Sequence, residues 1–290
     1  MKKRVLALSL AVIMLFVTFA FAACSKKEDT PDPDPVVAED TTAGDAAVVA
    51  DLDAVKAKGT LVVGITYFEP MNYFDENGEL VGFETEFAKA VAANLGVDVE
   101  FKEIDWDHKI IDLKAGDIDC IWNGMTIRED FKSEIDYSEA YMANKQVAVV
   151  RAADSENYTD LASMAGAAFV AEAGSAGEDA ILADNSLSGN YVAAETQAKS
   201  LQEVKAGASD VAIIDAVMAY SMVGEDTDFS DLLVLDVFDD SANEEYGIGF
   251  RKGSDLVAAV NGAMEALAAD GTLAQIAKTY GLETRILLDI

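Results

Sequence analysis

The sequence contains little cysteine, little histidine and few basic residues. Its 290 residues include two cysteines and one histidine, and 21 Lys and Arg stand against 53 Asp and Glu. Two cysteines cannot make a metal-binding cysteine set, so we expect no metal site, and nothing in the composition calls for a cofactor. A surface this acidic repels phosphate, which makes nucleic acid an unfavourable partner. After residue 23 no segment is apolar enough to span a bilayer.

The first 24 residues have the pattern of an export signal. Three basic residues at positions 2–4 precede an almost unbroken apolar run over residues 5–23. This order is typical of a secretory signal peptide. The end of the run, from Phe21 to Cys24, resembles a bacterial lipobox, in which the cysteine is lipidated and becomes the new N-terminus. The alternative is a plain transmembrane anchor, because the run is about long enough to cross a membrane.

Residues 24–51 are predicted to be the lipidated cysteine followed by a disordered acidic linker. Cleavage before Cys24 removes three basic residues, which leaves 18 against 53 acidic ones and a net charge of about −35. The linker is rich in Pro, Asp and Ala, buries little apolar surface and has a typical reach of about 30 Å. We therefore expect a body at the extracytoplasmic face of the cell membrane, attached to it through the N-terminal lipid.

From Leu52 onward, strand and helix signals alternate in two series. Strands are expected at residues 61–65, 99–104, 120–122, 146–150, 167–170, 191–193, 211–214 and 232–237. Helices are expected at 84–95, 109–115, 177–183, 198–206, 216–223, 255–269 and 272–280. This alternation predicts an α/β fold with parallel sheets. About 240 folded residues in two series favour two lobes. Cys120, inside an apolar run, is expected to be a buried core residue.

Candidate site residues follow the strands, where open parallel sheets gather their ligands. The chain has no nucleophile elbow, no phosphate-binding loop with Lys and no paired-His metal motif, so we expect no catalytic residues. Aromatic rings, small hydroxyls, glycine backbone and one acid are instead suited to binding a small solute. The predicted ligand-binding residues are Phe68, Trp106, Asn123, Gly124, Thr126, Arg128, Ser175 and Asp215.

Several of these residues also have a structural interpretation. Phe68 and Trp106 could sandwich a solute or belong to the core. Ser175 could bind a carboxylate at a helix start or only cap that helix. Asp215 suits an ammonium but could also be a cap. His108 is expected to be a surface residue.

Several motifs, in family order, resemble the bacterial extracellular solute-binding proteins of family 3, which serve ABC importers of polar amino acids. The segment 82–95, GFETEFAKAVAANL, fits the family signature, and further matches are DENGELV at 75–81, LKAGDID at 113–119, GMTI at 124–127, DYSEAY at 136–141, VAIID at 211–215, YGIGFRKG at 246–253 and DGTL at 270–273. The resemblance covers about residues 52–283, which is essentially the whole folded part.

The resemblance implies a two-lobed periplasmic-binding-protein-like (type II) fold with two hinge crossings. It places lobe 1 at residues 52–143 plus 242–290 and lobe 2 at 144–241, with crossings near 142–146 and 237–244. It implies that Phe68 and Trp106 are apolar clamps, that Gly124 and Thr126 contact the solute, that Ser175 lies in a carboxylate-binding turn, and that Asp215 holds the α-ammonium. The implied partner is an ABC transporter permease, and we expect a monomer.

One position departs from the family pattern. Members usually have an Arg five residues after the Thr of GMTI, where it clamps the α-carboxylate, and here that position is Phe131. Arg128 lies only two residues after Thr126, and it either reaches the cleft or points to solvent. Loss of a bidentate clamp weakens the case for an ordinary α-amino acid. A cationic or aromatic ligand is therefore an alternative.

The sequence thus predicts a lipid-anchored receptor whose two lobes close on a small polar solute, an amino acid or a relative, rather than an enzyme. The alternatives are an enzyme similar to cyclohexadienyl dehydratase, with Glu69, Asp105 or Asp107 as its acid, and a sensory lipoprotein on the same fold.

Overall fold

The computed structural model describes residues 50–238 and 243–290. The predicted signal peptide 1–23, Cys24 and residues 25–49 of the expected linker lie outside the described residues. All described residues belong to one compact unit, 46–290. None of the helices in this described part has the length and apolarity that crossing a bilayer requires.

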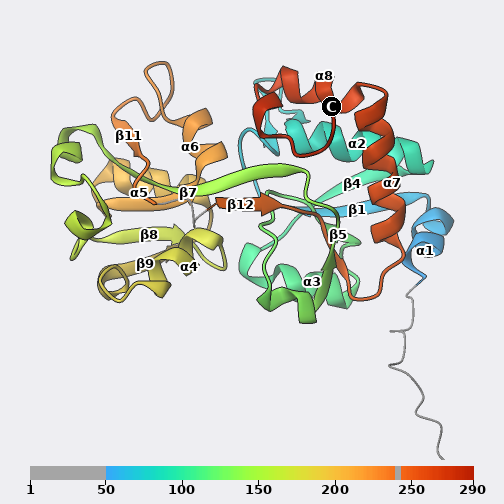
Figure 1. Cartoon of the computed structure of the whole chain (residues 1–290), viewed down its shortest axis with the longest axis horizontal. Coiled ribbons are helices and arrows are strands. Elements are labelled where there is room, and N and C mark those ends of the chain that lie inside the picture. Colours follow the sequence, from blue (N-terminus) through green and yellow to red (C-terminus); the bar gives the residue numbers. More distant parts are fainter. Residues whose placement is uncertain (1–49, 239–242) are drawn as a thin grey trace, which may run out of the picture. The chain divides into compact units, whose positions relative to one another are not determined.

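The helices and strands alternate along the chain and form a mixed α/β fold (Figure 1). The helices are α1 Asp51–Lys58, α2 Phe83–Leu95, α3 Lys109–Ala115, α4 Ala176–Ala183, α5 Gln197–Ala206, α6 Ala216–Met222, α7 Leu256–Ala269 and α8 Thr272–Thr279. The strands are β1 Thr60–Ile65, β2 Tyr73–Phe74, β3 Leu80–Val81, β4 Asp98–Glu103, β5 Cys120–Ile121, β6 Ile135–Tyr137, β7 Met142–Arg151, β8 Phe169–Glu172, β9 Tyr191–Ala194, β10 Val211–Asp215, β11 Leu232–Leu235, β12 Asn243–Tyr246 and β13 Gly249–Arg251.

The first sheet has the order β4-β1-β5-β13-β6 and draws its strands from both ends of the chain. β1 pairs in parallel with β4 and β5, whereas β13 runs antiparallel to both β5 and β6. In Figure 1, helices α2, α7 and α8 lie on one side of this sheet and α3 lies on the other. The side chains of Phe83, Phe87 and Val91 recur along one face of α2 and are fully buried, which explains why this helix packs against the sheet.

The second sheet has the order β11-β7-β10-β8-β9. β10 is parallel to β8 and β8 to β9, but β7 and β11 are antiparallel to their neighbours. The prediction of parallel sheets therefore holds for β8, β9 and β10 but is wrong for β7 and β11. A strand that enters a sheet from the other lobe runs opposite to the strands that helices connect within that sheet. The local alternation of strands and helices therefore does not determine how such a strand pairs.

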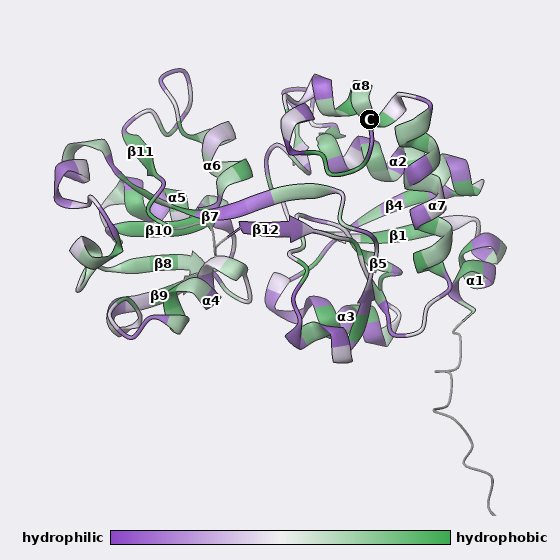
Figure 2. Cartoon of the chain, in the orientation of Figure 1, coloured by the Kyte–Doolittle hydropathy of each residue, from purple (hydrophilic) through white to green (hydrophobic). Residues whose placement is uncertain are grey.

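Two crossing strands connect the sheets. The first half of β7 pairs with β12, and its second half pairs with β10 and β11. After β12 the chain enters β13 of the first sheet. Figure 2 shows that β12 is hydrophilic, whereas β1, β8 and β10 are largely hydrophobic. Polar residues in the crossing strands thus lie beside the edges of both sheets.

Candidate functional site

A cavity lies between the two sheets and encloses about 420 Å³ between its atoms, solvent at its mouth included. Every one of the eight sequence-predicted residues lines it. Phe68, Trp106, Asn123, Gly124, Thr126 and Arg128 come from the first lobe, and Ser175 and Asp215 come from the second. The cavity is also lined by Lys109, Met125, Phe131, Glu172, Gly174, Ala176 and Gln197.

Asp215 is the last residue of β10 and is almost fully buried. Its carboxylate accepts hydrogen bonds from three side-chain amides, those of Asn144 (2.5 Å), Gln146 (2.7 Å) and Gln197. Burial raises the pKa of Asp215, and the amide donors counter this effect in part. Its side chain makes no capping hydrogen bond to α6, so the interpretation as a helix cap does not hold. A buried carboxylate with only neutral partners is suited to a cationic group.

Ser175 stands at the start of α4 and does cap it. Its hydroxyl oxygen accepts from the backbone N–H of Glu178 at 3.1 Å. The N–H of Gly174 donates to the Glu178 carboxylate at 2.7 Å. Ser175 and Ala176, the first residue of α4, both line the cavity, and the Ser175 hydroxyl can still donate its proton. Ser175 thus combines the capping role with a position in the cavity wall.

The floor of the first lobe is built around Gly124, which has a left-handed φ of +57°. Its N–H donates to both carboxylate oxygens of Glu84, at 2.9 and 3.0 Å, so in this conformation the N–H does not donate to a solute. Glu84 also accepts from the Tyr141 hydroxyl. Burial raises the pKa of Glu84 to about 7. A side chain at Gly124 would meet the ring of Phe68, which explains the requirement for glycine.

Asn123 is held by its own lobe. Its side-chain oxygen accepts from the Thr66 hydroxyl at 2.6 Å, and its amide donates to the Thr66 carbonyl at 2.8 Å. These contacts fix the segment that carries Gly124 and Thr126. Asn123 therefore supports the wall of the cavity as well as lining it.

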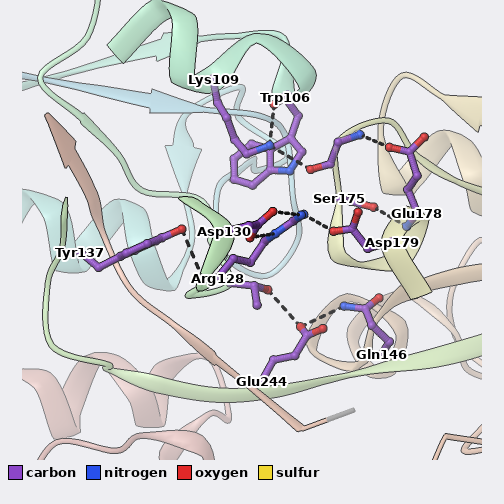
Figure 3. A network of polar contacts seen from close by, with 12 residues as sticks. Trp106, Lys109, Arg128, Asp130, Tyr137, Gln146, Ser175, Glu178, Asp179 and Glu244 are labelled. Atoms are coloured by element: carbon purple, nitrogen blue, oxygen red, sulfur yellow. Dashed lines mark hydrogen bonds and ion pairs between the residues drawn. The ribbon is translucent and has the colours of Figure 1, made fainter. Parts of the chain in front are cut away.

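Lys109, at the start of α3, is a cavity residue that the sequence did not reveal. Its side chain is only 4% exposed, and its Nζ lies 4.6 Å from the ring centroid of Trp106 and 5.6 Å from that of Phe131. The ammonium donates to the Trp106 carbonyl and, across to the second lobe, to the Gly174 carbonyl, both at 2.9 Å (Figure 3). Burial lowers the pKa of Lys109 to about 8.

Arg128 reaches the cavity, but its guanidinium is already paired. It donates to both oxygens of Asp130, at 3.1 and 2.7 Å, and forms an ion pair with Asp179 of the second lobe (Figure 3). Its centre lies 4.4 Å from the ring centroid of Phe131, the residue at the usual position of the carboxylate-clamping Arg. In this conformation Arg128 bridges the lobes.

Thr126 faces the crossing strands. Its hydroxyl donates to Glu244 of β12 at 3.0 Å, and Glu244 also accepts from Asn144 and Gln146 of β7, each at 3.1 Å. Burial and the nearby negative charge of Asp215 raise the pKa of Glu244 to about 7. The crossing strands therefore connect Thr126 to Asp215 through shared amide side chains.

Glu172 ends β8, next to the strand that ends in Asp215. Its side chain is 4% exposed, and its Oε1 has no hydrogen-bond partner among the described residues. Burial and the negative charge of Asp215 raise its pKa to about 8, against a lowering effect of Lys109. The sequence does contain a signal for Glu172, because it precedes Gly174 and Ser175 in a segment that follows a strand. No local sequence pattern distinguishes Lys109, Gln197 or Glu244.

Other residues considered from the sequence lie elsewhere. Cys120 and Trp122 are buried in the core, where the Trp122 ring packs edge-on against Phe87 at a centroid distance of 5.2 Å. His108 is exposed and lies 3.2 Å from Asp105. Among the residues that line the cavity there is no Glu69, Asp105 or Asp107, the acids considered as the acid of a dehydratase. Within residues 50–238 and 243–290, no group of three or more metal-binding side chains gathers.

Comparison with known proteins gives a consistent result. Residues 61–283 match the bacterial extracellular solute-binding proteins, family 3. The chain is 28% identical over 232 residues to the L-cystine-binding protein TcyJ of Escherichia coli, covering 79% of this chain and 85% of that protein.

Two solved structures are similar as well. One is an ABC uptake transporter substrate-binding protein from Streptococcus pneumoniae with bound histidine (TM-score 0.72, 27% identity, 79% of this chain and 95% of that one). The other is the ancestral amino acid-binding protein AncCDT-1, described as a precursor of cyclohexadienyl dehydratase (TM-score 0.71, 29% identity, 80% and 99%).

Proposed function

Because the chain belongs to the bacterial extracellular solute-binding proteins, family 3, a family of amino acid-binding components of ABC transporters, we propose that its two lobes close on an amino acid or a close relative and deliver it to a permease. The observation that carries the proposal is that residues of both lobes line this cavity. A solute that touches both lobes stabilises the closed form, because only that form makes all the contacts.

The roles within the cavity follow from the chemistry of its walls. Asp215 binds the ammonium of the solute, since its present partners are neutral amides. Phe68 and Trp106 cover the apolar part of the solute. The Ser175 hydroxyl and the start of α4 receive a carboxylate where the solute has one.

A thermal-shift screen of amino acids, amines and short peptides tests this function. We expect at least one compound to raise the melting temperature, because binding to the folded state alone stabilises it. Asp215→Asn keeps the size of the side chain, and it should abolish the shift for any hit that carries an ammonium. Asp117→Asn removes a charge at an exposed position and should leave the shift unchanged. A hit that persists in Asp215→Asn would contradict the assignment of this acid.

We also propose that the protein acts as a monomer attached to the membrane by lipid on Cys24. The basic start, the apolar run and the cysteine at its end support this attachment. Cys24→Ser should release the protein from the membrane fraction of bacterial cells that express it. A variant that remains in the membrane fraction would favour the uncleaved anchor.

A dehydratase or a sensory role has less support. None of the acids considered for a dehydratase is among the residues that line the cavity. Incubation with prephenate or arogenate should therefore yield no aromatic product. Pull-down from membranes should recover a transport permease rather than a kinase.

A further inference from the structure

The cavity contains a carboxylate that the proposed ammonium site does not use. Glu172 is buried and lines the cavity, and its Oε1 lacks a hydrogen-bond partner among the described residues. A carboxylate in such a position is costly to ionise unless a partner neutralises it. The adjacent parallel strands β8 and β10 bring Glu172 and Asp215 to the same edge of the sheet.

The cations of the cavity do not supply this partner. Arg128 is paired with Asp130 and Asp179. The ammonium of Lys109 donates to two backbone carbonyls, those of Trp106 and Gly174, and Oε1 of Glu172 receives no hydrogen bond from it.

Acidic side chains therefore outnumber basic ones around the cavity, and a cation that enters it favours their ionised forms. Once Arg128 is offset by its two acidic partners, Lys109 remains as the one cation among the described residues that line the cavity. The same walls carry the carboxyl groups of Glu172 and Asp215. The approach of Asp105 to Glu172 and of Asp107 to Lys109 adds to the negative potential. The rings of Trp106 and Phe131 already lie beside the Lys109 ammonium, and aromatic faces of this kind favour cations over neutral groups.

We propose that Glu172 holds a second cationic group of the solute, so that the cleft selects a basic amino acid over a neutral amino acid of the same shape. This inference rests on the proposed function, in which Asp215 takes the α-ammonium. Glu172 is then a specificity-determining residue, because the neutral solute leaves its carboxylate buried and unpaired.

Calorimetric titration with two matched pairs of solutes tests the inference. L-arginine and L-citrulline differ in charge but hardly in shape, and L-lysine differs from L-norleucine by its ammonium. We expect the wild-type protein to bind the cationic member of at least one pair about tenfold or more tightly than the neutral member. In Glu172→Gln, which keeps the side chain's shape, the ratio should fall below about threefold, mainly through weaker binding of the cationic solute.

Two control variants separate the possible outcomes. Glu195→Gln removes the same charge from an exposed position of the same lobe and should preserve the wild-type ratio. Equal affinities within both pairs, or a ratio that survives in Glu172→Gln, would overturn the role of Glu172 but leave the proposed function standing if Asp215→Asn still abolishes binding. If no amino acid binds the wild-type protein at all, the proposed function fails and this inference fails with it.

Discussion

Gly124 illustrates how a single residue shapes the cavity. It has a left-handed φ of +57°, and a Cβ placed on it would lie 2.3 Å from a ring atom of buried Phe68. Gly124→Ala should therefore lower the free energy of unfolding by about 1–3 kcal/mol and weaken solute binding, because the alanine is strained and the Phe68 ring must move. Chemical denaturation measures the loss of stability.

Gly78→Ala is the matched control for this prediction. Gly78 also has a positive φ, +79°, but nothing lies within 4 Å of its added Cβ. Gly78→Ala should lower the free energy of unfolding by about 1 kcal/mol, through backbone strain alone, and leave solute affinity unchanged. Equal losses of stability in the two variants would show that the contact with Phe68 does not matter.

At Glu172, solute binding should depend on pH. Its pKa is raised to about 8 in the free protein, so the carboxyl is largely protonated at neutral pH, and a cationic group in contact favours the ionised form. Binding of L-arginine should then release protons, and its affinity should rise between pH 6 and pH 8. Calorimetry in buffers of different ionisation enthalpy measures the release. Binding of L-arginine to Glu172→Gln should release fewer protons than binding to the wild-type protein. An equal release in both proteins would contradict this assignment.

Residue types after strands predicted much of the cavity wall, because the chemistry of Phe68, Trp106, Ser175 and Asp215 is visible in the sequence. Their contact with a solute remains a prediction. Lys109 could not be found in this way, because its partner is the carbonyl of Gly174, 65 residues away in the other lobe. Backbone acceptors carry no sequence signal.

Among the elements, α3 and the turn before α4 make one of the contacts between the lobes, through the hydrogen bond from Lys109 to the Gly174 carbonyl. Lys109→Met keeps an apolar stem beside Trp106 but removes this donor. Hydrogen bonds from charged groups contribute about 1.5–3 kcal/mol, so the closed form should be less populated without solute. Small-angle scattering should show a larger radius of gyration than that of the wild-type protein.

Lys114→Met provides the control for this variant, because Lys114 lies on the same helix but pairs with Glu134 of its own lobe. Its scattering should match that of the wild-type protein. If Lys109→Met also leaves the radius of gyration unchanged, this contact does not hold the lobes together.

The elements with strong apolar patterns were predicted well, whereas two polar elements, β12 and α1, were missed. The expected helices over 84–95 and 272–280 correspond to α2 and α8, with ends shifted by one residue. β12 was missed because its sequence, NEEY, has no apolar alternation, and the strand exists through its pairing with β7. α1 was missed because it lies at the edge of a segment with a linker's composition.

For the whole molecule, three buried carboxyl groups should make stability fall as pH rises. Glu84 and Glu244 have pKa values raised to about 7, and Glu172 has one raised to about 8, above the values expected in the unfolded chain. Between pH 4.5 and 8 the folded protein therefore holds protons that the unfolded chain has lost, and the free energy of unfolding decreases with pH. We expect a higher melting temperature at pH 5 than at pH 8.

The net charge of −32 acts in the same direction, and salt distinguishes the two effects. In 1 M salt the Debye length is about 3 Å, so surface repulsion is screened while the buried groups still titrate. The double variant Glu172→Gln, Glu244→Gln should then show a flatter pH dependence than the wild-type protein. A melting temperature that does not fall toward pH 8 in high salt would contradict the raised pKa values.

At this largest scale, the two-lobed fold was predictable from the alternation of strands and helices together with the family motifs. The pairing of the C-terminal strand β13 with β5 was not, because the contact joins residues more than 120 positions apart and has no local pattern. The resemblance supplied what composition and periodicity could not.

The central claim is that one cavity, lined by both lobes, receives the ammonium of a small solute at Asp215. A crystal structure of the protein with its strongest amine-bearing thermal-shift hit tests this claim most directly. We predict that the ammonium nitrogen lies about 3 Å from the Asp215 carboxylate, with Phe68 or Trp106 against the same molecule. A solute bound outside this cavity, or touching only one lobe, would contradict the account.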